Sequence, residues 1–96
     1  MRLRQEEINL IKEEIKKLID GDIYIFGSRV DDSKLGGDID IFIIPKKRLS
    51  VKERVKIANE IKIRLEYELF VPIDVIISKN LNRPIEKEAL KGIKIG

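Results

Sequence analysis

The strongest constraint on the fold of this chain is the alternation of short β-branched segments with longer segments of helical periodicity. Three segments are rich in Ile and Val and are bounded by turn-forming residues, as strands usually are: 22–26, 38–44 and 72–78. Two others, 4–19 and 50–68, repeat apolar residues at helical spacing. Such an alternation predicts an α/β (α+β) domain, a small sheet with helices packed against it.

Start and stop signals delimit these elements. Asp20-Gly21 ends the first helix, and Ser50 with Glu53 has the spacing of a capping box. We expect the apolar face of the long helix to contain Val51, Val55, Ala58, Ile61 and Leu65. Pro84 begins a short helix that ends near residue 91, and the last residues, GIKIG, form a short fourth strand.

The connection between the first two strands limits the topology of the sheet. It spans residues 27–37, which is short for a helical crossover of about a dozen residues or more. The first two strands are therefore expected to run antiparallel. We predict a mixed sheet of three to four strands with helices on one face.

Length and composition exclude several classes of protein. The 96 residues predict one domain over 1–96. No apolar run approaches the roughly 20 residues of a membrane span, and the charged N-terminus lacks a signal-peptide core, so we expect a cytoplasmic protein. With 20 basic and 17 acidic residues, the net charge of +3 is mild, and nucleic acid is not the expected partner.

The absence of Cys and His restricts the possible chemistry. It excludes disulfides, thiolate and imidazole nucleophiles, and metal sites with sulfur or imidazole ligands. Catalysis would have to use carboxylates, hydroxyls, Lys, Arg, backbone amides or a metal with oxygen ligands.

Two acidic residues at strand spacing are the first candidate site. Asp38 and Asp40 share one face of a strand, with Cα atoms about 6.6 Å apart, whereas Ile39, Ile41 and Ile43 face the opposite side. Two such carboxylates repel each other, and Mg²⁺ would remove the repulsion. The alternative is an edge strand whose charges prevent aggregation.

A third carboxylate lies in the later strand. Asp74 interrupts the apolar run Pro72-Ile73-Asp74-Val75, where a buried charge is costly unless it is paired or bound to a metal. If this strand lies beside the others, Asp74 joins Asp38 and Asp40 in an oxygen-rich site for one or two Mg²⁺ ions. The alternative is a structural Asp on an exposed face.

The turn after the first strand is a candidate phosphate site. Gly27 allows close approach of the backbone, Ser28 supplies a hydroxyl group and N–H groups, and Arg29 supplies positive charge. The alternative is a plain turn in which Ser28 caps a short helix.

Together these residues resemble a known family. The segment FGSRVDDSKLGGDIDIFI is similar to the G-S-x(n)-D-x-D signature of the polymerase-β-type nucleotidyltransferase superfamily. The short chain resembles the minimal nucleotidyltransferase (MNT) subfamily, the MntA-like antitoxins paired with HEPN toxins. The resemblance covers the whole chain and implies a fold like the palm of polymerase β.

The resemblance also implies roles for the candidate residues. Gly27 and Ser28 would hold a nucleoside triphosphate, ATP. Asp38 and Asp40 would bind Mg²⁺, and Asp74 would bind the catalytic metal and help to activate the attacking hydroxyl group. The implied activity is transfer of AMP to a hydroxyl group, a tyrosine being the lead acceptor, on a HEPN-type helical toxin, in an oligomer or heterocomplex.

Two alternatives stay open at this point. In the first, the chain neutralises its partner by contact alone. The loop favours this reading, because the usual Arg-x-Arg-Gly after the Ser is altered, with Val30, Asp31 and Asp32 following Arg29. The interval from Ser28 to Asp38 is also one residue shorter than usual. In the second, the chain is an aminoglycoside-type nucleotidyltransferase, although such enzymes usually carry a further helical domain.

Overall fold

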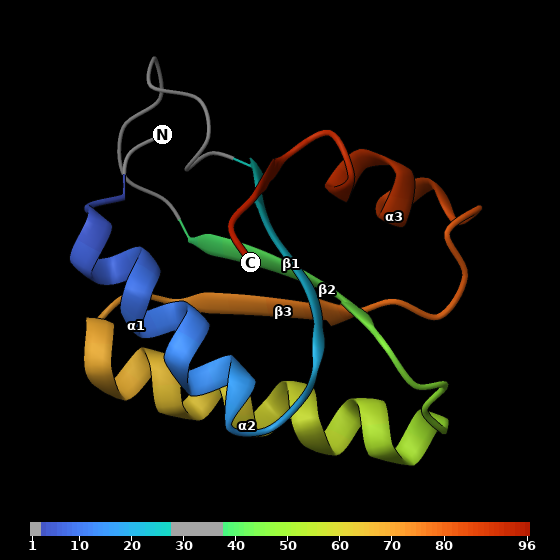
Figure 1. Ribbon diagram of the computed structural model, residues 1–96, viewed down its shortest axis with the longest axis horizontal. Coiled ribbons are helices and arrows are strands. Elements are labelled where there is room, and N and C mark those ends of the chain that lie inside the picture. Colours follow the sequence, from blue (N-terminus) through green and yellow to red (C-terminus); the bar gives the residue numbers. More distant parts are fainter. Residues whose placement is uncertain (1–2, 28–37) are drawn as a thin grey trace.

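The computed structural model describes residues 3–27 and 38–96, and its elements follow the predicted order (Figure 1). They are α1 (Gln5–Lys16), β1 (Gly21–Phe26), β2 (Ile39–Pro45), α2 (Val51–Leu69), β3 (Ile73–Ile77), α3 (Pro84–Ala89) and β4 (Ile93–Lys94). The largest difference from the predicted bounds is at the end of α1. There the N–H groups of Leu18 and Ile19 both donate to the carbonyl of Ile15, closing the helix earlier than predicted.

The four strands form one mixed sheet in the order β3-β2-β1-β4, which confirms the predicted sheet type. β1 runs antiparallel to both β2 and β4, whereas β2 and β3 are parallel. Parallel neighbours need a long crossover, and α2 supplies it between β2 and β3. The short β1–β2 connection leads to an antiparallel pair, as its length predicted.

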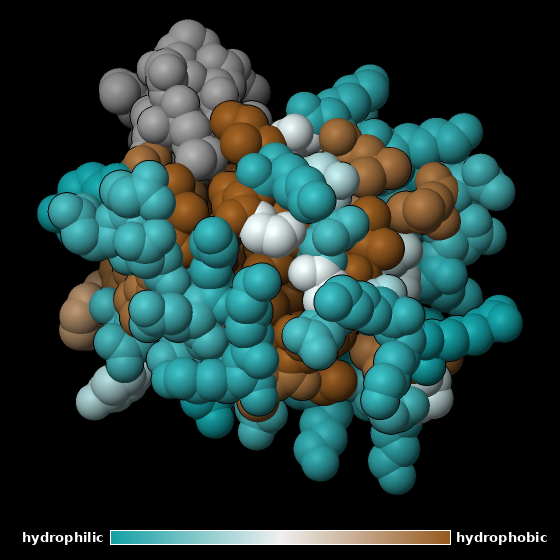
Figure 2. All heavy atoms as spheres, viewed as in Figure 1, coloured by the Kyte–Doolittle hydropathy of each residue, from teal (hydrophilic) through white to brown (hydrophobic). Residues whose placement is uncertain are grey.

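One layer of helices, α1 and α2, covers one face of the sheet. The core joins buried residues of both helices to alternate residues of the strands: Ile11, Ile15, Ile23, Ile25, Ile39, Ile41, Ile43, Ile61, Leu65, Ile73 and Ile77. Hydrophilic side chains surround the apolar ones on the face seen in Figure 2. No helix in the described ranges is both long and apolar enough to span a bilayer.

The apolar face expected for α2 is correct in its C-terminal half and wrong in its first turns. Ile61 and Leu65 are buried, whereas Val51 and Val55 are 62% and 55% exposed. In the view of Figure 1 the N-terminal turns of α2 extend past the end of β3, which agrees with the exposure of Val51 and Val55. The predicted capping box is present, because Ser50 Oγ accepts from the Glu53 N–H at 3.1 Å and a Glu53 carboxylate oxygen accepts from the Ser50 N–H at 3.0 Å.

The short helix α3 is held by a buried carboxylate. Glu86 has no exposed surface and accepts hydrogen bonds from Ser78 Oγ at 2.6 Å and from the N–H groups of Lys79 and Asn80, each at 3.0 Å. Arg83 Nη1 adds a longer contact at 3.4 Å. Burial alone would raise the pKa of Glu86, but the hydrogen bonds outweigh it and lower the pKa. Glu86 therefore fixes the loop between β3 and α3.

Replacing Glu86 by Ala should lower the free energy of unfolding by about 2–4 kcal/mol, because two backbone N–H groups and a hydroxyl group lose their buried acceptor. Urea denaturation at neutral pH measures this loss. The control is Glu88→Ala, which removes an exposed carboxylate paired with Lys91 on the same helix and should change stability by less than about 0.5 kcal/mol. Equal losses in the two variants would contradict the role of Glu86.

Candidate functional site

The three predicted carboxylates lie at one edge of the sheet, where β2 and β3 begin. The parallel register places Asp40 directly opposite Asp74, and neighbouring strands are about 4.8 Å apart. Asp38 precedes Asp40 by two residues and so lies on the same side of the strand. The strand pairing therefore brings the three acidic residues together, as the sequence predicted.

The surroundings of the three carboxylates differ. Asp40 is half-buried, whereas Asp38 and Asp74 are exposed. The expectation that Asp74 is buried within its strand is therefore wrong. The requirement that a buried charge be paired or bound to a metal does not apply to this carboxylate. Ile73 on the other side of β3 is fully buried, so the strand has one apolar face and one acidic face at this end.

Like charges lie close together at this acidic edge. Partial burial, together with the neighbouring charges of Asp74 and Asp38, raises the pKa of Asp40 to about 6. A cation with oxygen ligands would remove this repulsion, so the donor set fits Mg²⁺. As they stand, no three acidic side chains in the described parts of the chain are arranged to hold an ion by themselves. Mg²⁺ commonly needs only one or two carboxylates and takes other ligands from substrate phosphates.

Gly27 lies against the acidic edge at the end of β1. Its φ of +78° belongs to the left-handed region, which a side chain would strain. A Cβ atom at this position would overlap the Asp40 carboxylate. Gly27 therefore makes room for Asp40, in addition to the role expected for it next to phosphate. Ser28 and Arg29, the other two predicted phosphate ligands, lie outside the described residues, and their roles stay predictions.

Lys62 is a neighbour of the site that the sequence analysis missed. Its Nζ donates to the carbonyl of Ile73 at 2.6 Å and to Glu66 Oε2 at 2.8 Å, and Glu66 Oε2 also accepts from the Ile73 N–H at 2.9 Å. Glu66 is the main cause that raises the pKa of Lys62, and the charges of Asp74 and Asp38 add to it. In the sequence, Lys62 and Glu66 have the spacing of an ordinary surface pair. In the structure they tie α2 to the start of β3.

Comparison with known proteins agrees with this arrangement. The family model described as "Polymerase beta, Nucleotidyltransferase" matches residues 6–95. No curated protein matches the chain.

Several solved structures share the fold. One is a complex of the tri-AMPylated HEPN toxin of Shewanella oneidensis with MNT antitoxin (TM-score 0.71, 20% identity, covering 98% of this chain and 72% of that chain). A second is a toxin–antitoxin structure with AMP-PNP (TM-score 0.71, 20% identity, 93% and 72% covered). A third is the MntA–HepT toxin–antitoxin structure (TM-score 0.68, 19% identity, 97% and 72% covered).

Replacing Asp40 by Asn should raise the melting temperature of the metal-free protein at pH 7.5, a pH roughly above both pKa values of this group. The pKa of Asp40 is about 6 in the fold against an ordinary 3.8, so its charged form is less favourable in the folded than in the unfolded state. The contribution of Asp40 to the free energy of unfolding is therefore largest at low pH, and it falls as the pH rises from 3.8 to about 6. Thermal denaturation in EDTA from pH 4 to 8 measures the effect.

The control for this experiment is Asp22→Asn, which removes an exposed carboxylate of β1 that pairs only weakly with Lys94. Asp40→Asn should make the melting temperature depend less on pH, and Asp22→Asn should leave this pH dependence unchanged. A lower melting temperature for Asp40→Asn in EDTA would show that the carboxylate has an internal partner and would contradict the charge analysis.

Proposed function

The chain belongs to the polymerase β nucleotidyltransferase family, and we propose that it transfers AMP from ATP to a hydroxyl group of a protein partner. The observation that carries this proposal is the in-register pairing of β2 with β3, which sets Asp40 opposite Asp74 with Asp38 beside them. Three neighbouring carboxylates suit the site of a divalent cation that is bound together with a polyphosphate.

Each residue of the site has a part in the proposed reaction. Gly27 and Ser28 receive the triphosphate, with Arg29 adding positive charge. Asp38, Asp40 and Asp74 hold Mg²⁺, which when bound neutralises phosphate charge and polarises the phosphoryl oxygens. In this scheme Asp74, the exposed member of the opposed pair, receives the proton of the acceptor hydroxyl group.

The bonds change in one displacement at the α-phosphorus. The acceptor oxygen forms a bond to this atom while the bond to the bridging oxygen of the β-phosphate breaks. Pyrophosphate leaves, and the product is a phosphodiester between AMP and the acceptor. Positioning and neutralisation of charge supply most of the rate enhancement in such transfers.

For the partner, we propose a HEPN-type toxin. The support is likeness of fold to chains in toxin–antitoxin complexes, one of which contains a tri-AMPylated HEPN toxin and another AMP-PNP. A domain of 96 residues also has little surface for enclosing a second substrate. A protein acceptor would supply the missing binding surface itself, within a heterocomplex in the cytoplasm.

A contact-only antitoxin is the second candidate function. One observation favours it: the described acidic side chains are not arranged to hold an ion without further ligands. In this case the chain would neutralise its partner without nucleotide transfer, and the acidic edge would be dispensable.

Label transfer separates the two functions. The purified protein is incubated with Mg²⁺, an extract of the cells from which the chain derives and ATP labelled at either the α- or the γ-phosphate. We expect a protein labelled only from the α position. Asp38→Asn/Asp40→Asn should reduce this label at least about 100-fold, because each carboxylate acts on the reacting phosphate through charge.

The control is Asp20→Asn/Asp22→Asn, a pair with the same spacing beside β1 whose members are both exposed. It should keep full transfer. If a pulled-down partner stays neutralised but takes no α label, the protein acts by contact. Label from the γ position would indicate a kinase instead and would contradict nucleotidyl transfer.

A further inference from the structure

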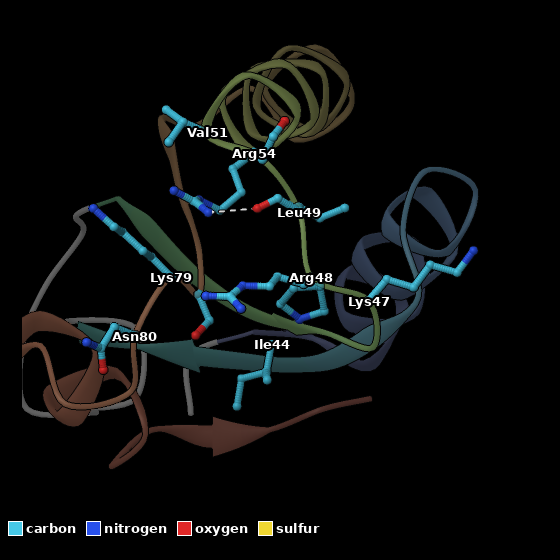
Figure 3. Close-up of a pocket in the computed structure, with 11 residues that line it drawn as sticks. Ile44, Lys47, Arg48, Leu49, Val51, Arg54, Lys79 and Asn80 are labelled. Atoms are coloured by element: carbon cyan, nitrogen blue, oxygen red, sulfur yellow. Dashed lines mark hydrogen bonds between the residues drawn. The ribbon is translucent and has the colours of Figure 1, made fainter.

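A basic hollow lies at the opposite end of the sheet from the acidic edge. It has a volume of about 620 Å³ and is formed where β2 and β3 end and α2 begins (Figure 3). Its lining includes Lys47, Arg48, Arg54 and Lys79 and contains no acidic residue. Four basic side chains thus gather around one concavity in a chain whose net charge is only +3.

Three of the four basic groups share one side of the hollow. Figure 3 shows Lys47 extending away from Arg48, Arg54 and Lys79. Arg54 Nη1 donates to the carbonyl of Leu49 at 3.0 Å, which holds this guanidinium group in place. A guanidinium group has five N–H donors, so Arg54 keeps further donors for a ligand.

The four basic side chains of the hollow have no carboxylate partner in the described part of the chain. Two carboxylates accept hydrogen bonds from lining residues, but from backbone N–H groups and a hydroxyl group and not from the four basic side chains. Glu53 accepts from the Ser50 N–H, and buried Glu86 accepts from the N–H groups of Lys79 and Asn80.

The hollow is separate from the acidic edge. Pro45, which lines it, lies five residues along β2 from Asp40, a distance of roughly 16 Å at the rise of a strand. A ligand of the hollow therefore does not need the carboxylates or their cation.

From this geometry we propose that the hollow binds a compact ligand with two or more linked phosphate groups, of the oligophosphate or nucleotide type. Guanidinium groups match phosphate oxygens in paired hydrogen bonds, and two of them with one amine balance more than a single phosphate. The concave shape favours a compact ligand. A nucleic acid strand would instead follow a basic groove several nucleotides long.

Titration calorimetry with sodium tripolyphosphate in EDTA tests the site without any contribution from a divalent cation. Arg48→Ala and Lys79→Ala should each weaken binding about tenfold, the loss expected for one charge-assisted hydrogen bond. Lys47→Ala, the matched control, removes the neighbouring charge that points away and should weaken binding less than about twofold. Asp38→Asn/Asp40→Asn should bind tripolyphosphate at least as tightly as the unaltered protein.

Three results would overturn the proposal: no binding by the unaltered protein, an equal loss in Lys47→Ala and Arg48→Ala, or loss of binding in the Asp38→Asn/Asp40→Asn variant. Arg48 and Lys79 are exposed, so we expect both variants to fold. Their melting temperatures check this. If one variant is unfolded, the other decides.

Two further titrations identify the class of ligand. A nucleotide site is supported if ADP and ATP bind with dissociation constants within about fivefold of that of tripolyphosphate and depend on Arg48 and Lys79 in the same way. A single-stranded oligonucleotide that binds more tightly than tripolyphosphate, with that dependence, would overturn the compact ligand in favour of nucleic acid. The outcome is independent of AMP transfer, since no reaction occurs in EDTA.

Discussion

The parallel pairing of β2 with β3 is the constraint on which both the core and the acidic edge depend. One side of this pair places Ile39, Ile41 and Ile43 against the helices, and the other side places Asp40 opposite Asp74. Because side chains alternate along a strand, a slip of one residue would send the isoleucines to solvent and the aspartates into the core. The free energy of burying the isoleucines therefore maintains the alignment of the carboxylates.

The same alignment places like charges together, at a cost to the folded state. The raised pKa of Asp40 shows that the fold opposes ionisation of this side chain. Lys62 and Glu66 offset part of that cost, since together they bind both backbone groups of Ile73 next to Asp74. Functional sites commonly depart from the most stable arrangement in this manner, and the surrounding structure compensates.

The sequence predicted the elements of the fold and the grouping of the acidic residues, because both follow from local patterns. Strand periodicity located β2 and β3, connection lengths predicted the mixed sheet, and the Ser50–Glu53 spacing predicted a capping box that is present. Properties set by tertiary packing were not predictable. The exposure of Val51 depends on how α2 packs against the sheet, and the burial of Glu86 depends on a loop that folds back over it. Nothing in the helical spacing of Lys62 and Glu66 indicated that both would bond to β3.

The two ends of the β2–β3 pair carry charges of opposite sign, with three aspartates where the strands begin and a basic hollow where they end. Such a separation gives the molecule an electric dipole along the strands. A polyanionic partner would therefore be approached with the basic end leading, and long-range attraction of this kind raises association rates most at low ionic strength. A cation bound at the acidic edge would reduce the negative charge at that end and raise the net positive charge of the molecule. Occupancy of the acidic edge would therefore change the rate at which the basic end associates with its partners.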